Sequence, residues 1–241
     1  FAASKDGNIL LANDANTYKL VNPELLGLPF KRSTARRIDY DNDGLTDLNV
    51  FPDGINHQKP DHQFEKTHIL ERNFSKISDV FCNWFDADND GRQDLLIAAK
   101  VLPTFREKIR QKLLSLFEQK PQDIHNFARQ DNRIFTVPEW KIFLYQNIRA
   151  NNHWLQVQLT GPVGNRPAIG TEVELETDNG IQHQKIGQAE DSLRSAGHYR
   201  IHFGLGAAKT VKALRLLSAN GNSQENTNIE VDKLLRLSLE S

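Results

Sequence analysis

The chain has 241 residues, enough for one large domain or two ordinary ones, and its 38% hydrophobic and 25% charged residues are typical of a globular protein and exclude a disordered one. Its net charge of −1 gives no basic field that would favour nucleic acid or an anionic membrane. No apolar run reaches the ~18 residues of a membrane-spanning helix.

Residues 1–100 predict short strands separated by turns. Asn8–Ala12 and Tyr18–Val21 are expected to pair as a hairpin around residues 13–16. Two later segments share an apolar entry, an acidic loop containing Gly, and an apolar exit: RIDYDNDGLTDLNVF at 37–51 and WFDADNDGRQDLLIA at 84–98. They repeat at 47 residues, and a repeat of roughly 20–50 residues predicts a propeller or a solenoid.

Both loops have the pattern D-x-D-x-D-G-x-x-D, which is typical of a calcium site. Ca²⁺ takes about 6–8 oxygen ligands, and alternate Asp residues in a tight loop turn three carboxylates toward one centre. The Gly permits the sharp turn, and the residue after it offers its carbonyl. The predicted ligands are Asp39, Asp41, Asp43, Leu45 and Asp47 in the first loop, and Asp86, Asp88, Asp90, Arg92 and Asp94 in the second.

Other interpretations of these loops are less favoured. An EF-hand needs a Glu at loop position twelve, where this chain has Val50 and Ile97, and its flanks are helices, not the strands expected here. A plain solvated turn would leave four carboxylates in nine residues to repel one another. Mg²⁺ fits less well, because it prefers a strict octahedron that keeps several waters.

The segment 103–137 departs from the strand pattern. Apolar residues recur at helical spacing in Thr104–Gln119, and Pro121 provides a stop. This predicts an amphipathic helix inserted between strands. Packing on its own domain is favoured over docking in a partner's groove.

The C-terminal part, from about Asn151, predicts a compact β-sandwich. Thr171–Glu176 alternates strictly, with Val173 and Leu175 inward, and Asp178-Asn179-Gly180 is a turn signal. One strand is expected just before this part, at Lys141–Gln146. The strands expected within it are Trp154–Leu159, Thr171–Glu176, Ile181–Ile186, Val211–Leu217 and Leu234–Leu239.

Two families resemble the two parts of the chain. The Asp loops, each followed by an apolar strand, resemble FG-GAP/VCBS repeats, the integrin-type propeller blades. Asn151-Asn-His-Trp154-Leu155, Asn165-Arg166-Pro-Ala168-Ile169-Gly170 and Phe203-Gly204-Leu205-Gly206 resemble the ASPIC/UnbV domain. The pairing resembles the architecture of cartilage acidic protein 1-like proteins.

The expected architecture is therefore all-β, with propeller blades and a helical insertion over 1–150 and an ASPIC/UnbV-like sandwich over 151–241. The resemblance implies a calcium-loaded, secreted or cell-surface interaction protein and implies no known reaction. We therefore expect a non-catalytic interaction or adhesion protein that is extracellular, at the cell surface or periplasmic. Its partner is expected to be a protein or a glycan. The start at Phe1 and the absence of Met favour a piece of a longer chain. The alternatives are an accessory region of a secreted hydrolase and a structural subunit of a larger assembly.

Several weaker signals favour structural interpretations. His57, His62 and His68 fit no zinc motif, so a solvated loop is favoured over a transition-metal site. A Ser-His-Asp site could be drawn from Asp191, Ser192 or Ser195 and nearby His residues, but no nucleophile-elbow sequence supports it. Arg36-Arg37 is interpreted as a solvated edge or as charge balance for the acidic loops. Gly204–Gly206 are interpreted as tight turns, and Trp84, Trp140 and Trp154 as core.

Overall fold

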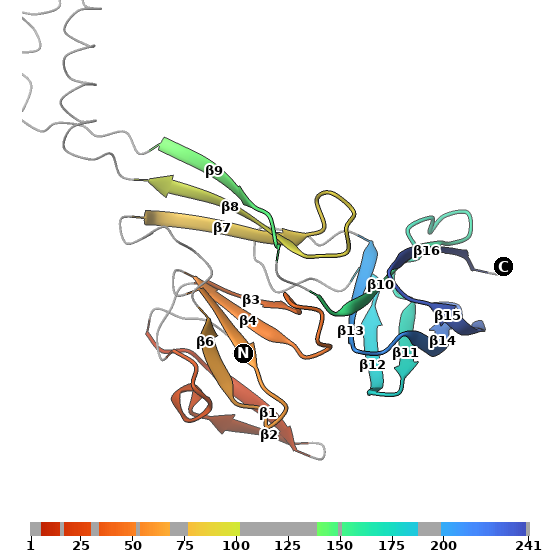
Figure 1. Ribbon diagram of the computed structural model, residues 1–241, viewed down its shortest axis with the longest axis horizontal. Helices are drawn as coiled ribbons and strands as arrows, with labels where there is room; N and C mark the ends of the chain where they lie inside the picture. The colour runs from red at the N-terminus through yellow and green to blue at the C-terminus, as the bar shows by residue number, and fades with distance from the viewer. Residues whose placement is uncertain are drawn as a thin grey trace, which may run out of the picture. The chain divides into compact units, whose positions relative to one another are not determined.

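A computed structural model describes residues 6–14, 17–29, 34–51, 54–67, 77–101, 139–148, 151–187 and 199–239 (Figure 1). Within these residues the protein is all-β, as predicted, and none of the sheets that they form closes on itself. The described part contains no helix long and apolar enough to cross a membrane. The predicted helical insertion lies outside the described residues.

The chain divides into two compact units. One comprises Phe1–Glu71, Asn83–Leu96 and Leu144–Ser241, and the other comprises Arg72–Cys82 and Ile97–Phe143. Both acidic loops and the whole C-terminal part belong to the first unit. The contacts of the acidic loops described below therefore all lie within that unit.

The N-terminal half contains a hairpin and a four-stranded meander. Strands β1 (Leu10–Asp14) and β2 (Thr17–Val21) pair antiparallel, which confirms the predicted hairpin. The meander runs in the order β3-β4-β5-β6, all antiparallel, and Leu28, Leu48 and Val50 form its buried core. Its strands are β3 (Thr34–Ile38), β4 (Asp47–Phe51), β5 (Gly54–Gln58) and β6 (Phe64–Thr67).

A second, three-stranded sheet has the order β7-β8-β9, formed by Ile77–Phe85, Asp94–Val101 and Glu139–Tyr145. The first acidic loop joins β3 to β4, and the second joins β7 to β8. Asp47 and Asp94, the last acidic residues of the two loops, open β4 and β8 respectively. Each loop thus occupies the same place between the first two strands of its sheet.

The C-terminal half consists of two sheets around one core. One has the order β13-β10-β16, with β16 parallel to β10, and the other is antiparallel in the order β12-β11-β14-β15. Leu155, Val173, Phe203 and Leu214 come from four strands and are each at most 1% exposed in the shared core. The strands are β10 (His153–Thr160), β11 (Glu172–Thr177), β12 (Gly180–Lys185), β13 (Arg200–Gly206), β14 (Thr210–Leu217), β15 (Ser223–Glu230) and β16 (Lys233–Ser238).

The sequence predicted most of these C-terminal strands and missed others. The alternation of Thr171–Glu176 is confirmed, because Val173 and Leu175 are buried while Glu172 is exposed. Strand β15 was not predicted, since SQENTNIE has only one fully buried residue, Ile229. The core assignment of Trp140 is wrong: it is 50% exposed and stacks on Phe81 with ring centroids 5.3 Å apart.

Leu175 offers a direct test of this core. Leu175→Ala removes a fully buried side chain, so we expect the free energy of unfolding to fall by about 2–5 kcal/mol, measured by denaturant titration. Ile181→Ala on the neighbouring strand is the control, because Ile181 is 53% exposed. Its effect should stay within about 0.5 kcal/mol. Equal losses in both variants would contradict the assigned inner face of β11.

Candidate functional site

The two acidic loops have the same internal hydrogen bonds. Asp39 Oδ1 and Oδ2 accept the backbone N–H groups of Asp43 and Gly44 at 3.1 and 2.9 Å. In the second loop Asp86 accepts those of Asp90 and Gly91 at 3.0 and 2.9 Å. The first Asp of each loop therefore closes the turn through the same two donors.

The ninth residue of each loop repeats this equivalence. Asp47 Oδ2 accepts the N–H of Tyr40 at 3.2 Å, and Asp94 Oδ2 accepts that of Ala87 at 3.1 Å. Asp47 Oδ1 accepts the backbone N–H of Gln58, the last residue of β5, at 2.7 Å. Asp94 Oδ1 accepts that of Asn147, just after β9, at 2.8 Å. Asp47 and Asp94 are 0% and 2% exposed, so these bonds are protected from water.

The backbone of the two loops also matches. Asn42 and Asn89 both have φ of 62°, and the loop glycines Gly44 and Gly91 have φ of 88° and 82°. Asn is one of the few residues that tolerate this left-handed region, and Gly adopts it without steric cost. The repeat seen in the sequence is thus a repeat of local three-dimensional structure.

The structure brings most of the predicted ligands together. Carboxylate oxygens of Asp39, Asp41 and Asp47 lie within 4.8 Å of one another, as do those of Asp86, Asp88 and Asp90. Asp43 instead groups with Asp41 and His57, while Asp94 is outside the second group. Leu45 and Arg92 donate their backbone N–H groups to the fifth-position residues Asp43 and Asp90 at 2.7 and 2.9 Å.

Burial, together with neighbouring carboxylates, raises the pKa values of Asp39, Asp41 and Asp47 in the first loop. Burial, then the charges of Asp43 and Asp47, raise the pKa of Asp39 well above its usual value. Burial raises the pKa of Asp47 to about 8, against the hydrogen bond from the Gln58 N–H. The pKa of Asp41 is also raised, by burial first and then by Asp43. A cation among these groups would favour their ionised forms.

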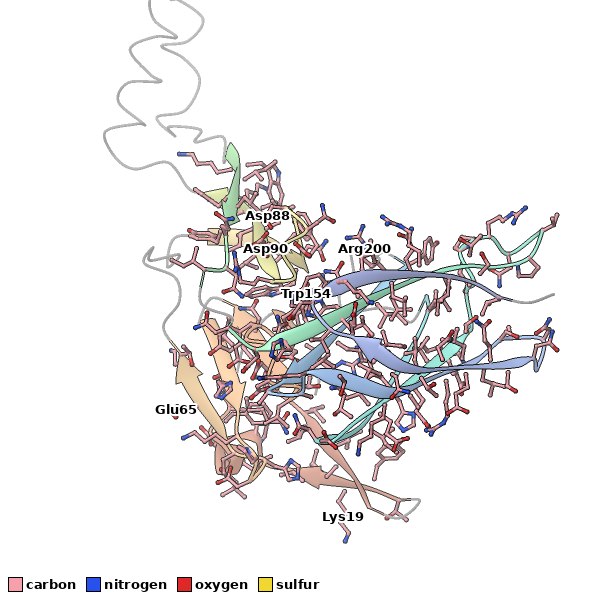
Figure 2. The ribbon with its side chains drawn as sticks, turned by 45° about the vertical axis from the view of Figure 1, so that its right-hand side comes forward. Lys19, Glu65, Asp88, Asp90, Trp154 and Arg200 are labelled. Carbon is pink, nitrogen blue, oxygen red and sulfur yellow. The ribbon has the colours of Figure 1, made fainter. Side chains whose placement is uncertain are left out.

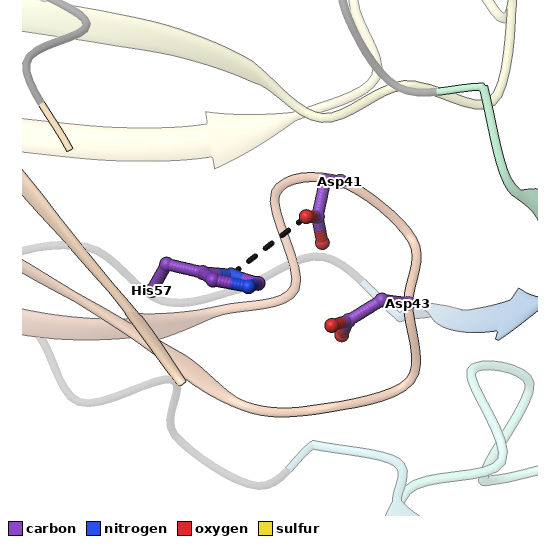
Figure 3. A group of neighbouring side chains, drawn as sticks. All are labelled: Asp41, Asp43 and His57. Atoms are coloured by element: carbon purple, nitrogen blue, oxygen red, sulfur yellow. Dashed lines mark ion pairs between the residues drawn. The ribbon is translucent and has the colours of Figure 1, made fainter. Parts of the chain in front are cut away.

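His57 lies beside the first acidic loop, although the sequence favoured a solvated loop over a transition-metal site for it. It is not in a solvated loop as expected, because it lies on β5 and its side chain is 25% exposed. Its Nδ1 is 3.1 Å from Asp47 Oδ1. It is also 3.7 Å from Asp41 Oδ2 (Figure 3). His62 is exposed and lies 3.3 Å from Gln58, and His68 is outside the described residues. The triad candidates Asp191, Ser192 and Ser195 are also outside them.

The segment between β9 and β10 contacts both loops. Gln146 Nε2 donates to Asp88 Oδ2 at 2.6 Å, and Asn147 Nδ2 donates to the carbonyl of Tyr40 at 2.6 Å. Asn152 Nδ2 donates to the carbonyl of Asp41 at 3.0 Å. This short stretch of chain therefore ties the two loops to the start of the sandwich.

The loops also pack against strand β13 of the sandwich. The Gly206 N–H donates to the carbonyl of Asn42 at 2.7 Å, and His202 Nε2 lies 2.7 Å from Asn42 Oδ1. A Cβ on Gly204 would lie 1.9 Å from Asp39 Oδ2. Gly204 is therefore a point of close approach on a strand, and its interpretation as a tight-turn glycine is wrong.

The second loop reaches the sandwich through other residues. Gln156 Nε2 donates to Asp86 Oδ2 at 2.6 Å, and Arg200 donates to Asn89 Oδ1 at 2.8 Å. A Cβ on Gly91 would lie 1.8 Å from the Trp154 ring. Figure 2 shows Trp154 and Arg200 beside the second loop, which carries Asp88 and Asp90.

A polar pocket of about 350 Å³ adjoins the first loop. Arg36 is 1% exposed, so its interpretation as part of a solvated edge is wrong. Trp84 is also buried, and its Nε1 has no hydrogen-bond partner. The polar and cationic residues that line the pocket include Arg36, Arg37, Lys185, Arg200, Gln93, Gln182 and Gln184.

Comparison with known proteins identifies the C-terminal part. Residues 161–241 match the family model described as ASPIC and UnbV. The match covers β11 to β16, whereas β10, the central strand of its sheet, precedes it. A search of curated proteins gave no match to this chain.

Gly204 tests the packing of the first loop on β13. Gly204→Ala places a methyl group against Asp39 and the backbone of Asn42, so overpacking should lower the free energy of unfolding by about 1–3 kcal/mol in a denaturant titration. Ala207→Ser, at an exposed position after the same strand, is the control and should change it by less than about 0.5 kcal/mol. A Gly204→Ala protein as stable as the parent would show that the loop does not pack there.

Proposed function

We propose that this chain is a non-catalytic, calcium-binding interaction protein in which each acidic loop holds one Ca²⁺. The observation that carries the proposal is the structural equivalence of the two loops, which have the same carboxylate–backbone bonds and the same left-handed residues. Two unrelated acidic turns would not be expected to share these hydrogen bonds and backbone conformations. Binding of the same kind of ligand would explain why both loops have them.

The donor set fits a hard cation. Asp41 Oδ1 is buried and has no hydrogen-bond partner, a costly state that a bound ion would relieve. In the first loop, Asp39, Asp41, Asp43 and Asp47 would hold the ion together with the carbonyl of Leu45. Bound Ca²⁺ would neutralise charges that otherwise repel within a partly buried loop.

Calcium in this position would stabilise the junction between the loops and the sandwich. Asp39 lies against Gly204, and Asp86 accepts a hydrogen bond from Gln156, so ordering these carboxylates also orders contacts to β13 and β10. Ion binding to the folded state raises its stability by mass action. The proposed role of the ion is therefore structural.

The sheets that carry the loops support a further part of the proposal. In each sheet, strands that follow one another in the sequence are neighbours, and the acidic loop joins the first two strands. This is the arrangement expected of FG-GAP/VCBS-type propeller blades. We propose that they are blades of such a propeller. A calcium-loaded protein of this kind is proposed to work outside the cell, at the cell surface or in the periplasm, where modules with calcium affinities near 10⁻⁴–10⁻³ M are loaded.

The pocket beside the first loop is the part of the surface that we propose for ligand binding. Its lining residues include the exposed Arg37, together with Lys185, which also pairs with Glu172, and Arg200, as well as the carboxylate residue Asp39 and three glutamines. Cationic groups complement a negative ligand, and amides bind hydroxyl groups. Of the two expected partner classes, this chemistry favours an acidic glycan over an apolar protein segment.

Calcium binding is tested by thermal unfolding with Ca²⁺ and with excess chelator. At ten times its dissociation constant, Ca²⁺ should stabilise the parent by about 1.4 kcal/mol per site and raise the melting temperature. The double variant Asp41→Asn with Asp88→Asn should lose this shift. Asp61→Asn with Asp178→Asn, two exposed acids outside the loops, should keep it. A calcium shift that persists in the loop variant would refute the proposed sites.

Ligand binding at the pocket is tested with an oligomer of glucuronic acid and a neutral oligomer of glucose of equal length. Isothermal titration calorimetry in Ca²⁺ should detect binding of the acidic oligomer alone. Arg37→Gln, at an exposed lining residue, should weaken it about tenfold, equivalent to one charge-assisted hydrogen bond. Arg236→Gln, an exposed change outside the pocket lining, should leave it unchanged; equal losses would indicate non-specific charge attraction.

A further inference from the structure

The two acidic loops differ at one equivalent position outside the nine-residue motif. Gln58 and Asn147 are equivalent, because each donates its backbone N–H to Oδ1 of the ninth-position Asp. The residues immediately before them are His57 and Gln146. Both side chains face the third-position Asp of their own loop. The same place is thus filled by an imidazole beside the first loop and by an amide beside the second.

We propose that His57 supplies a nitrogen ligand to the ion held in the first loop, and so makes this loop selective for a first-row transition ion of the Mn²⁺ type over Ca²⁺. The second loop remains an all-oxygen calcium site. This inference rests on the proposed function, because it requires that the loops bind cations. It adds a different ion and a ligand from outside the motif.

The imidazole is placed for coordination. Donor atoms of Asp41, Asp43 and His57 lie within 4.8 Å of one another, and Figure 3 shows the three side chains converging. His57 Nδ1 is also 3.1 Å from Asp47 Oδ1, so the ring faces the third and ninth acidic positions together. Tyr40 packs edge-on against this ring with centroids 5.9 Å apart, which helps to fix its orientation.

The third-position carboxylates show where a ligand is needed. Asp88 is satisfied by the protein, since Oδ1 accepts the Asp90 N–H at 3.2 Å and Oδ2 accepts Gln146 Nε2 at 2.6 Å. Asp41 Oδ1 is buried and has no hydrogen-bond partner. A metal ion shared with the facing imidazole would satisfy this oxygen. The unmatched oxygen and the histidine occur in the same loop.

Donor chemistry then separates the two ions. Ca²⁺ selects oxygen ligands, whereas imidazole suits first-row transition ions, and Mn²⁺ also accepts carboxylates. At the second loop, Gln146 can offer only an amide oxygen, and the Arg92 guanidinium contacts Asp90. This guanidinium lowers the net negative charge of the second loop. The loops should therefore differ in the ratio of their Mn²⁺ and Ca²⁺ affinities.

The test uses proteins with one intact loop each. Asp88→Asn leaves the first loop, Asp41→Asn leaves the second, and isothermal titration calorimetry measures Mn²⁺ and Ca²⁺ separately for both. We expect the Mn²⁺/Ca²⁺ affinity ratio to be at least about tenfold higher for the first loop, the size of effect that a change at a metal site commonly produces. His57→Gln should remove this difference, and Gln146→His should raise the ratio of the second loop.

A positioning role for His57 would give a different pattern. If His57→Gln weakens both ions by the same factor, the histidine only orients Asp47 and the inference is overturned. Equal ratios at the two loops would also overturn it, while calcium binding and the proposed function would stand. Failure of Ca²⁺ to bind either loop would refute the proposed function itself.

Discussion

The buried carboxylates of the two acidic loops are the constraint around which the first unit is organised. Asp39, Asp47, Asp86 and Asp94 each accept two backbone N–H groups, and these bonds set the turn of each loop and its connection to the adjoining strands. Burying such charges is unfavourable unless they are hydrogen-bonded and compensated. The backbone donors meet the first requirement. The proposed cation would meet the second.

The packing of the first acidic loop also restricts the sequence of strand β13. It packs one face into the sandwich core through Phe203 and Leu205, which are 0% and 1% exposed, and lies against the first loop at Gly204. Residues on a strand alternate between faces, so a strand packed on both sides must have small residues where a loop backbone approaches. The Phe-Gly-Leu-Gly motif meets both demands in four residues. It is thus as much a docking surface as a part of the C-terminal domain.

Sequence predicted the local features of this arrangement and missed the distant ones. The Asp residues of each loop lie within nine positions, and three of the four in each loop have carboxylate oxygens within 4.8 Å of one another, while Asp43 and Asp94 lie outside these groups. The alternation in Thr171–Glu176 predicted which face of β11 is buried. The position of His57 beside the first loop was not predicted, because its contact with Asp47 depends on the pairing of β4 with β5. The contact of Gly204 with Asp39 spans a far greater separation and leaves no local periodic signal. Strand β15 was not predicted because it has little apolar sequence of its own. Its partner β14 supplies most of the buried apolar surface.

The segment 146–152 shows why the loops and the sandwich should respond together. Among its described residues, Gln146 donates to Asp88 of the second loop, and Asn147 and Asn152 donate to Tyr40 and Asp41 of the first. The connection that precedes β10 therefore contacts both loops. Strand β10 is the central strand of its sheet, and Gln156 within it bonds back to Asp86. A change that disorders the second loop removes supports of this connection and of β10 at once, whereas the first loop contacts this connection and β13. Energetic coupling can be carried by such a chain of packed and hydrogen-bonded groups, and here it is formed by amide side chains that the acidic motif alone does not specify.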